Sequence, residues 1–429
     1  MRASSYSSYR NRRRRERRVL TAVLLTLLAL VLLAAFFLFR NSEASSEEAR
    51  APEEVYTQAL TPETGGKDNV PQAWSTKPSA VRGIYLTGAM AGGPNLDAYI
   101  DLANETEVNA MVVDVKEGGE LTYPSEVPLA KEIGATSDYI PDLEKVVRRL
   151  KDNDIYAIAR LAVFQDDILA RERPELAVMN SVTGGPWVNY NDVAWTNAYR
   201  KEVWEYNVAI AKEAAEAGFD EIQFDYIRFP SDGPMDQLDY GEETFPTQED
   251  AIAGFLKYAH GKLEPTGVEV AADVFGLVGH NDNGGIGQRV SKMVPYLDVL
   301  CPMVYPSHYG PGSYGFPNPN AEPYGVIQVS MEEFQQKARK ANPDLELRPW
   351  LQDFDMGVPD YGPAEVKAQM QATYDLGLTG WLLWNAGSEF SADALAPEGA
   401  ENVPNEPVKA EEDQDKDSQY AKNAGEPTE

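Results

Sequence analysis

The stretch Gly218-Phe-Asp-Glu-Ile-Gln-Phe-Asp-Tyr-Ile-Arg-Phe-Pro230 follows a long helical pattern and predicts a buried strand. Its bulky apolar residues alternate with polar ones, and the turn-forming Ser231-Asp-Gly-Pro234 ends it. Two opposite charges, Asp225 and Arg228, lie near the C-terminal end of this strand. Because an unpaired buried charge is costly, they predict either a functional site or a structural ion pair.

Seven further apolar segments alternate with amphipathic helical patterns on both sides of this strand. The strands are expected at residues 82–86, 110–115, 156–163, 221–229, 269–275, 299–305, 346–351 and 380–384, and the helices at 96–103, 140–151, 198–217, 248–262, 286–294, 331–341 and 364–376. Ser330 with Glu333 fits a capping box, and Pro363 fits the first turn of the last helix. Together they predict an α/β fold, a closed (β/α)8 TIM barrel over residues 80–395. The alternative is a doubly wound open sheet, although no Gly-rich dinucleotide fingerprint follows the first strand.

The chain before the barrel is divided by composition into three segments. Residues 1–18 form a basic head, and residues 19–39 form an apolar run long enough to span a bilayer. Residues 40–79 are an acidic linker without periodicity, and residues 396–429 are an acidic tail of the same kind. Arginines before the apolar run and glutamates after it predict a single-pass membrane anchor, with the N-terminus cytoplasmic and the barrel extracellular. A cleaved signal peptide is the alternative, but this run is longer than the apolar core of most signals.

The charge balance limits the possible partners. The formal net charge is −30, and outside residues 1–40 the chain holds 29 basic against 67 acidic side chains. Such a surface repels nucleic acid and argues against a polyanionic substrate. One cysteine, Cys301, excludes an internal disulfide, and three histidines without metal-ligand spacing favour neither a histidine-built metal site nor a cofactor. We expect a monomer.

Polar and aromatic residues gather at the C-terminal ends of the predicted strands, which meet at one mouth of a barrel. The candidates are Tyr85, Asp114, Lys116, Arg160, Asp225, Arg228, Asp273, Tyr305, Trp350, Gln352, Asp353 and Trp384. Glycoside hydrolysis uses two carboxyl groups beside the scissile bond, and aromatic rings stack on sugars. Acidic clusters also hold metals, and each charge could belong to a structural pair; Asp114, for example, could simply pair with Lys116 or Arg160.

The segment from about Val81 to Ser391 resembles the bacterial "putative glycosyl hydrolase domain" family. The residues that carry the resemblance are Arg82-Gly-Ile-Tyr85, Val112-Val-Asp-Val-Lys116, the block from Gly218 to Pro230, Ala272-Asp-Val-Phe-Gly276, Met303-Val-Tyr-Pro306 and Arg348-Pro-Trp-Leu-Gln352. The resemblance implies a TIM barrel that hydrolyses glycosidic bonds.

Two groups of related barrels sharpen the assignment of the carboxyl groups. Chitinase-like barrels end their fourth-strand motif in a glutamic acid, and Ile227 stands at that position here. Amylase-like barrels carry a nucleophilic aspartate at the end of strand four, a Glu acid/base at strand five and a further aspartate after strand seven. Asp225 and Asp353 match the two aspartates, while Asp273 replaces the glutamate.

The sequence therefore predicts a membrane-anchored extracellular hydrolase of a cell-wall or environmental polysaccharide. Asp225 is the expected nucleophile, oriented by Arg228 or Lys116, and Asp273 the expected acid/base with a raised pKa. The other candidates would bind the substrate. Two alternatives stay open: a non-catalytic glycan-binding protein of the cell envelope, and a hydrolase whose divalent cation is held by Asp114, Asp225 and Asp273.

Overall fold

The computed structural model describes residues 77–281 and 284–398. The predicted basic head, the apolar run 19–39, the linker up to residue 76 and the tail from residue 399 lie outside the described residues. Among the described residues, no helix is both long and apolar enough to cross a membrane. The membrane anchor thus stays a prediction.

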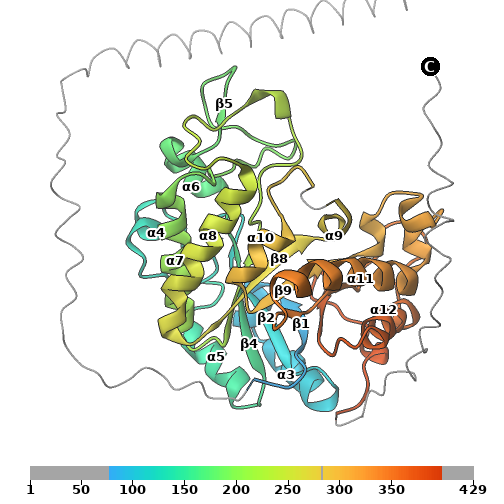
Figure 1. Ribbon diagram of the computed structural model, residues 1–429. Coiled ribbons are helices and arrows are strands. Elements are labelled where there is room, and N and C mark those ends of the chain that lie inside the picture. Colours follow the sequence, from blue (N-terminus) through green and yellow to red (C-terminus); the bar gives the residue numbers. More distant parts are fainter. Residues whose placement is uncertain (1–76, 282–283, 399–429) are drawn as a thin grey trace, which may run out of the picture. The chain divides into compact units, whose positions relative to one another are not determined.

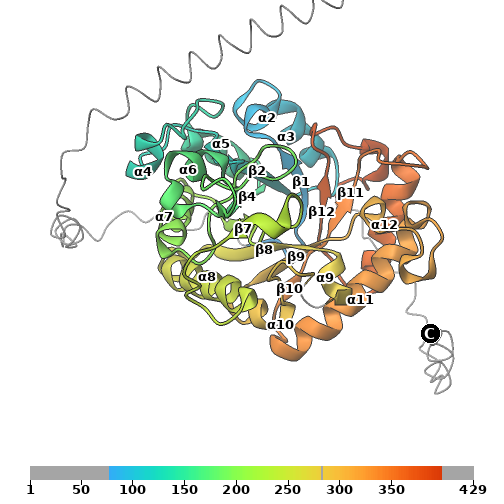
Figure 2. The same ribbon diagram turned by 90° about the horizontal axis from the view of Figure 1, so that it is seen from above.

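Eight parallel strands close into a barrel, in the order of the chain (Figures 1 and 2). They are β1 (Arg82–Leu86), β2 (Ala110–Glu117), β4 (Tyr156–Ala162), β6 (Glu221–Asp225), β8 (Glu269–Phe275), β9 (Val299–Met303), the interrupted pair β10 (Glu346–Leu347) and β11 (Trp350–Gln352), and β12 (Trp381–Trp384). The pairing of β12 with β1 closes the ring. The predicted TIM barrel is confirmed, and the open-sheet alternative is wrong.

A layer of helices surrounds the strands when the barrel is viewed along its axis (Figure 2). The helices are α2 (Gly88–Gly92), α3 (Leu96–Glu105), α4 (Pro128–Glu132), α5 (Leu143–Lys151), α6 (Asp167–Glu172), α7 (Lys201–Glu216), α8 (Gln248–Leu263), α9 (Leu277–Asn281), α10 (Val290–Met293), α11 (Pro323–Ala341) and α12 (Pro363–Asp375). Short strands β3 (Glu120–Leu121), β5 (Met179–Asn180) and β7 (Leu238–Asp239) lie in the loops. β5 pairs with β7 at the top of Figure 1.

Several local predictions were wrong, and two of them concern the end of β6 and the start of α11. The predicted strand 221–229 ends at Asp225, so Arg228 belongs to a loop. The capping box at Ser330 does not exist, because α11 begins seven residues earlier at Pro323. Ser330 is instead buried and donates a hydrogen bond to Tyr309 Oη at 2.9 Å. The first-turn Pro363 is confirmed.

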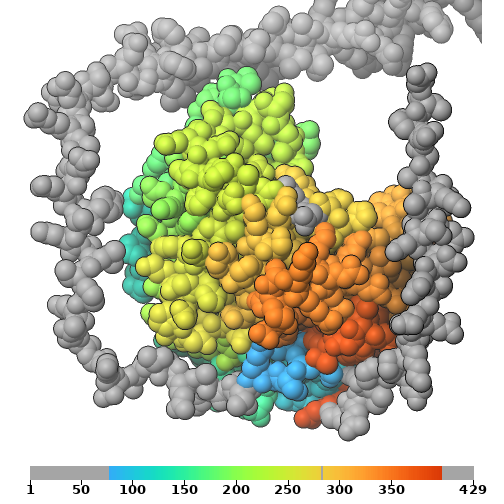
Figure 3. Space-filling view, viewed as in Figure 1, coloured from blue at the N-terminus to red at the C-terminus, as the bar shows by residue number. Residues whose placement is uncertain are grey.

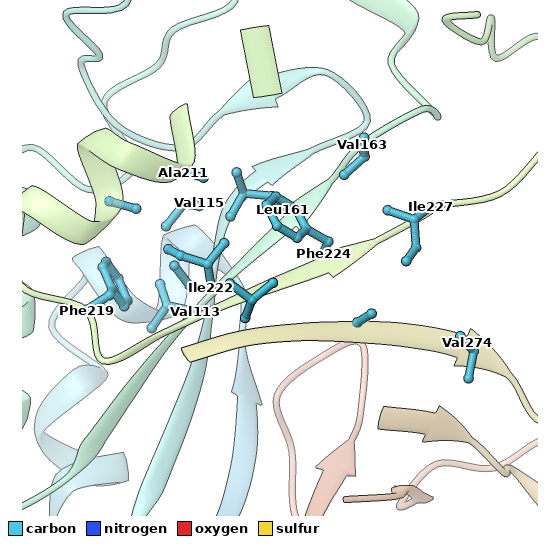
Figure 4. Packing of buried hydrophobic residues seen from close by; sticks show 14 of the residues in the cluster. Val113, Val115, Leu161, Val163, Ala211, Phe219, Ile222, Phe224, Ile227 and Val274 are labelled. Carbon is cyan, nitrogen blue, oxygen red and sulfur yellow. The ribbon is translucent and has the colours of Figure 1, made fainter. Parts of the chain in front are cut away.

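Alternation along the strands divides the buried side chains into two clusters. Tyr85, Val112, Ile158, Ala271 and Cys301 pack inside the barrel with side chains of the other strands. Their strand neighbours point outward and pack under the helices. Figure 4 shows part of this outer layer, where residues of β2, β4 and β6 meet α7. At the upper end of the barrel, Tyr305 and Trp350 of the inner cluster lie beside the charged residues Arg160, Asp225 and Asp273.

The described chain stays in contact with the barrel at both of its margins. Lys77 pairs with Glu269 at 2.6 Å and with Glu346 at 2.8 Å. Near the other end, the Pro397 backbone forms an isolated bridge with Thr106. The folded domain therefore reaches slightly beyond the predicted limits 80–395.

Candidate active site

A cavity of about 350 Å³ opens at the C-terminal ends of the strands. Four charged side chains line it, and the remaining wall is mostly aromatic and apolar. The lining residues are Arg160, Asp225, Tyr226, Arg228, Asp273, Phe275, Gly276, Leu277, Met303, Tyr305, His308, Tyr309, Trp350 and Trp384. The space-filling view shows the domain surface hollowed between its green-to-yellow upper part and its orange part (Figure 3).

Arg160, which projects into the barrel from β4, joins the acidic residues of the mouth. Its Nη1 donates to Asp114 Oδ1 at 2.5 Å and to Glu117 Oε2 at 2.7 Å. Its Nη2 and Nε donate to Asp225 Oδ2 at 2.6 and 3.1 Å. The guanidinium is buried, so these charge-assisted bonds are poorly screened and hold the carboxylates in fixed positions.

Asp225 is the last residue of β6, and the backbone turns sharply after it. Tyr226 has φ of 51°, a left-handed conformation that is uncommon for a residue with a large side chain. The Tyr226 amide donates to Asp225 Oδ1 at 2.5 Å, so both carboxylate oxygens of Asp225 accept hydrogen bonds. The strained turn therefore holds the carboxylate at the rim of the cavity.

Asp273 lies on β8, next to Asp225 in the barrel wall. Its Oδ1 accepts a hydrogen bond from Trp350 Nε1 at 2.8 Å, while its buried Oδ2 has no hydrogen-bond partner in the described chain. Burial, and then the negative charge of Asp225, raise the pKa of Asp273 well above its ordinary value. A carboxyl group that keeps its proton near neutral pH suits a general acid.

The two carboxyl groups lie close together. Asp225 Oδ2 is 3.1 Å from Arg160 Nε, and Asp273 Oδ2 is 4.0 Å from the same nitrogen. The separation of these two oxygens cannot exceed the sum of the two distances. That limit allows the spacing of about 5–5.5 Å found in retaining glycosidases and the lower part of the range of about 6.5–9.5 Å found in inverting ones.

Asp114 lies on the far side of Arg160 from these two groups and does not line the cavity. The hydroxyl of Tyr85 donates to Asp114 Oδ2, and the Tyr85 ring packs on Trp384 with ring centroids 4.1 Å apart. Burial raises the pKa of Asp114 to about 6, although the charge of Arg160 opposes this shift. Tyr85 and Asp114 thus support Arg160 and the aromatic wall from behind.

Arg228 lines the cavity from the loop after β6 and makes no ion pair with Asp225. Its Nη1 donates to Phe229 O and Ser231 Oγ, both at 3.1 Å. Arg160, rather than the predicted Arg228 or Lys116, holds Asp225. The loop placement of Arg228 explains the difference, because the strand ends three residues before it.

Lys116 lies outside the barrel, although alternation predicts that it shares the inner face with Asp114. The β2–β4 register shifts between Asp114 and Lys116, so one extra residue turns Lys116 toward the helices. Its Nζ is 2.7 Å from Asp166 Oδ2 and donates to Asn207 Oδ1 at 2.9 Å. The structure therefore does not bring Lys116 to the cavity.

Gln352 and Asp353 lie beside the cavity and hold its loops. Gln352 accepts a hydrogen bond from the Ser307 amide at 3.1 Å. Asp353 accepts hydrogen bonds from the amide and hydroxyl of Ser391, both at 2.8 Å. Neither residue is among those lining the cavity.

The aromatic wall includes predicted and unpredicted residues. Tyr305, Trp350 and Trp384 line the cavity as expected, and Trp350 packs edge-on against Trp384. Several residues of the site were not among the predicted site residues: Glu117 beside Arg160, and the lining residues Tyr226, Phe275, Gly276, Leu277, Met303, His308 and Tyr309. Phe275 and Met303 lie on predicted strands in phase with Asp273 and Tyr305, a signal that could have identified them. Leu277 begins α9, and His308 and Tyr309 lie in the segment after β9, where strand alternation gives no signal.

No three His, Cys, Asp or Glu side chains in the described ranges converge on a point that could hold a metal ion. The guanidinium of Arg160 lies between Asp114 and Asp225, and within 4.0 Å of Asp273. The three aspartates of the metal hypothesis are therefore arranged around an arginine. This set of side chains can donate a proton, present a carboxylate and stack on a ring.

Comparison with solved structures gives related folds. A hypothetical protein from Ruminiclostridium thermocellum ATCC 27405 is 42% identical, with 44% of this chain and 97% of that chain covered and a TM-score of 0.42. The PgaB (BpsB) glycoside hydrolase domain from Bordetella bronchiseptica is 13% identical, with 74% and 99% covered and a TM-score of 0.53. The glycoside hydrolase domain of PelA from Pseudomonas aeruginosa is 12% identical, with 73% and 97% covered and a TM-score of 0.42.

No curated protein matches the sequence. A family model described as "Putative glycosyl hydrolase domain" matches residues 83–390, which include every residue that lines the cavity and all of the barrel strands except Arg82, the first residue of β1. The chain therefore belongs to this glycosyl hydrolase domain family.

Proposed function

We propose that the protein is a glycoside hydrolase in which Asp225 is the nucleophile and Asp273 the general acid/base. The observation that carries this proposal is the placement of the two carboxyl groups. They lie on the neighbouring strands β6 and β8, approach the same Arg160 nitrogen and line one aromatic cavity. Family membership supports hydrolysis of a glycan in general.

The environments of the two groups suit different roles in the reaction. Arg160 and the Tyr226 amide stabilise the Asp225 carboxylate, which would attack the anomeric carbon. Burial keeps the proton on Asp273, which would pass it to the glycosidic oxygen as that bond breaks. Asp273 would then take a proton from the water that releases the sugar from Asp225.

The substrate that we propose is a polysaccharide or oligosaccharide outside the cell. The aromatic rings of Tyr305, Trp350 and Trp384 offer apolar faces for sugar rings. The arginine-rich head and the apolar run 19–39 support a membrane anchor with the barrel on the outer side. A cell-wall or environmental glycan is within reach of that position.

The second candidate is a non-catalytic glycan-binding protein. One observation favours it: both bonds from Arg160 to Asp225 are those of a well-formed structural pair. A binding protein would use the same cavity and aromatic wall without proton transfer.

Release of reducing sugar from a panel of bacterial and plant polysaccharides tests the proposal. The full chain, Asp225→Asn and the loop control Asp355→Asn are compared. We expect turnover by the parent and the control, and a loss of about 10³-fold or more in Asp225→Asn, because the nucleophile is removed. Glycan binding without turnover, equal in parent and Asp225→Asn, would instead establish the binding protein.

A further inference from the structure

Arg228 carries a positive charge that forms no ion pair with a carboxylate in the described chain, and Asp225 and Asp232 act on it only from a greater distance. Its side chain is 6% exposed and lines the cavity, yet no Asp or Glu oxygen of the described residues lies within 4.0 Å of it. Arg160, in the same cavity, instead pairs with three carboxylates at distances of 2.7 Å or less. A buried and unpaired charge costs several kcal/mol of stability, so its presence calls for a reason.

The guanidinium of Arg228 also has unused hydrogen-bond donors. Nη1 is engaged by Phe229 O and Ser231 Oγ. Nε is buried without a partner, and Nη2 makes no hydrogen bond within the described residues. Nε and Nη2 form one edge of the planar group, and two parallel N–H donors on one edge match the two oxygens of a carboxylate.

Three aromatic rings hold the guanidinium in place. Its central carbon lies 4.7 Å from the ring centroid of Trp195, 5.3 Å from that of Tyr226 and 4.5 Å from that of Phe275. These contacts offset part of the cost of burial without supplying a counter-charge. Burial lowers the pKa of Arg228, but an arginine side chain keeps its proton in proteins.

The other charged groups of the cavity lining form no ion pair with Arg228. Asp225 is bound by Arg160, and burial raises the pKa of Asp273, which favours its uncharged form. Arg228 is therefore the charged side chain of the cavity lining that has no ion pair within the described residues.

We propose that the cavity binds a sugar that bears a carboxylate, such as a hexuronic acid residue, and that Arg228 pairs with that carboxylate. This inference rests on the proposed function, and it names the substrate class. The carboxylate meets Nη2 first, and it reaches Nε once the surrounding rings move slightly, because Nε is covered. Arg228 is thus a specificity-determining residue.

The acidic surface restricts the substrate further. At physiological ionic strength, charges separated by more than about 8–10 Å are screened from each other. The acidic surface therefore repels a polymer with many closely spaced negative charges, but it has little effect on a single carboxylate bound in the cavity. The preferred glycan carries isolated carboxylates on an otherwise neutral chain. This restriction reconciles the binding site with the charge balance of the whole sequence.

Binding measured without turnover tests the proposal. The probes are glucuronic, galacturonic and mannuronic acid-containing oligosaccharides, each compared with the same oligosaccharide after reduction of its carboxyl groups to alcohols. The proteins are the full chain with Asp225→Asn, which removes the nucleophile, and the same chain with Arg228→Gln or Arg228→Lys added. Arg171→Gln is the matched control, because Arg171 is exposed on α6, pairs with Asp167 four residues before it and does not line the cavity.

We expect at least one acidic oligosaccharide to bind about 10–100-fold more tightly than its reduced form, the range that a charged hydrogen bond provides. Arg228→Gln should abolish this preference and leave binding of the reduced form unchanged, while Arg228→Lys should keep part of it. Arg171→Gln should behave as the parent does.

Equal affinity for acidic and reduced forms would overturn the inference, as would failure of every acidic probe to bind. If Arg228→Gln lost the binding of both the acidic and the reduced oligosaccharides, the inference would also be overturned, since Arg228 would then only stabilise the loop after β6. Turnover of neutral glycans alone would contradict this inference while the proposed hydrolase stands. A carboxylate preference that depends on Arg228, without turnover of any glycan, would contradict the hydrolase and leave the inference standing.

Discussion

The interior of the barrel holds two buried networks built around an arginine, one at each end. At the lower end, where β6, β8 and β10 begin, Arg348 Nη1 donates to both carboxylate oxygens of Glu221 at 2.9 Å. Glu346 pairs with Arg348 and Lys77, and Glu269 pairs with Lys77. Two cations, Arg348 and Lys77, therefore pair with three carboxylates, and none of these five side chains lines the cavity.

The upper network has a larger excess of carboxyl groups over cations. Arg160 alone has Asp114, Glu117, Asp225 and Asp273 within 4.0 Å. Asp273 has a buried carboxyl oxygen without a hydrogen bond in the described chain, and Tyr226, which follows Asp225, has a left-handed backbone conformation. We infer that a buried arginine does not by itself mark a function, and that the larger excess of carboxyl groups, backbone strain and access to a cavity make the upper network the stronger candidate.

The largest effect is expected for Asp273→Asn, which removes the acid/base of the upper network. Turnover should fall by about 10²–10⁴-fold. The free energy of unfolding should stay about the same, because Asn is uncharged, as protonated Asp273 is, and its amide oxygen can accept the Trp350 hydrogen bond. Steady-state kinetics and urea unfolding measure the two quantities, and a retained turnover would remove Asp273 from the mechanism.

Lys116→Gln sharpens the comparison with a buried pair that has no access to the cavity. The change leaves Asp166 without its cation in a site where both side chains have no exposed surface. The free energy of unfolding should fall by about 3–5 kcal/mol. The turnover of the folded fraction should stay within about 3-fold of the parent, and a selective loss of turnover would restore the substrate-binding role predicted from the sequence.

The upper network also predicts a dependence of stability on pH. The pKa of Asp114 is raised to about 6 in the folded protein from an ordinary value of 3.8. A raised pKa means that the folded state binds the proton more tightly, so this contribution to stability is full below pH 3.8 and is lost as the pH rises through about 6. Urea unfolding measured between these pH values should show that the free energy of unfolding declines less steeply with rising pH in Asp114→Asn than in the parent. An identical pH dependence in both proteins would contradict the prediction.

The smallest effect is expected for Asp353→Asn. The carboxylate anchors Ser391 through two hydrogen bonds, one of which the amide oxygen can keep. The free energy of unfolding should fall by about 1 kcal/mol, the usual contribution of one hydrogen bond. Thermal unfolding measures this change. A loss of turnover larger than about 10-fold would indicate that Asp353 touches the substrate, as its match to amylase-like barrels implies.

The barrel could be predicted from the sequence because strand periodicity and helix periodicity alternate along the chain without interruption. The first strand and the fifth have the predicted bounds, 82–86 and 269–275. The loops could not be predicted, since their conformations depend on contacts between distant residues. The hydroxyl of Ser330, for example, donates a hydrogen bond to Tyr309, so Ser330 can lie inside a helix instead of at its start.

The same reasoning applies to the candidate site. Asp225, Asp273, Tyr305, Trp350 and Trp384 were placed at the mouth because they follow the period-two alternation of their strands. Lys116 was misplaced because a β-bulge adds one residue, and no local signal in Val112-Val-Asp-Val-Lys116 reveals it. The alternation of inward and outward side chains is interrupted where the pairing between two strands is irregular.

The central claim is that the upper network is catalytic and the lower one structural. Turnover and the free energy of unfolding, measured on the same preparations of Asp225→Asn and Glu221→Gln, test it most directly. Both variants remove one negative charge from a buried arginine. We expect Asp225→Asn to lose about 10³-fold or more of turnover. Glu221→Gln should keep its turnover and lose about 3–5 kcal/mol of stability. Equal losses of turnover in the two variants, or full activity in Asp225→Asn, would contradict the account.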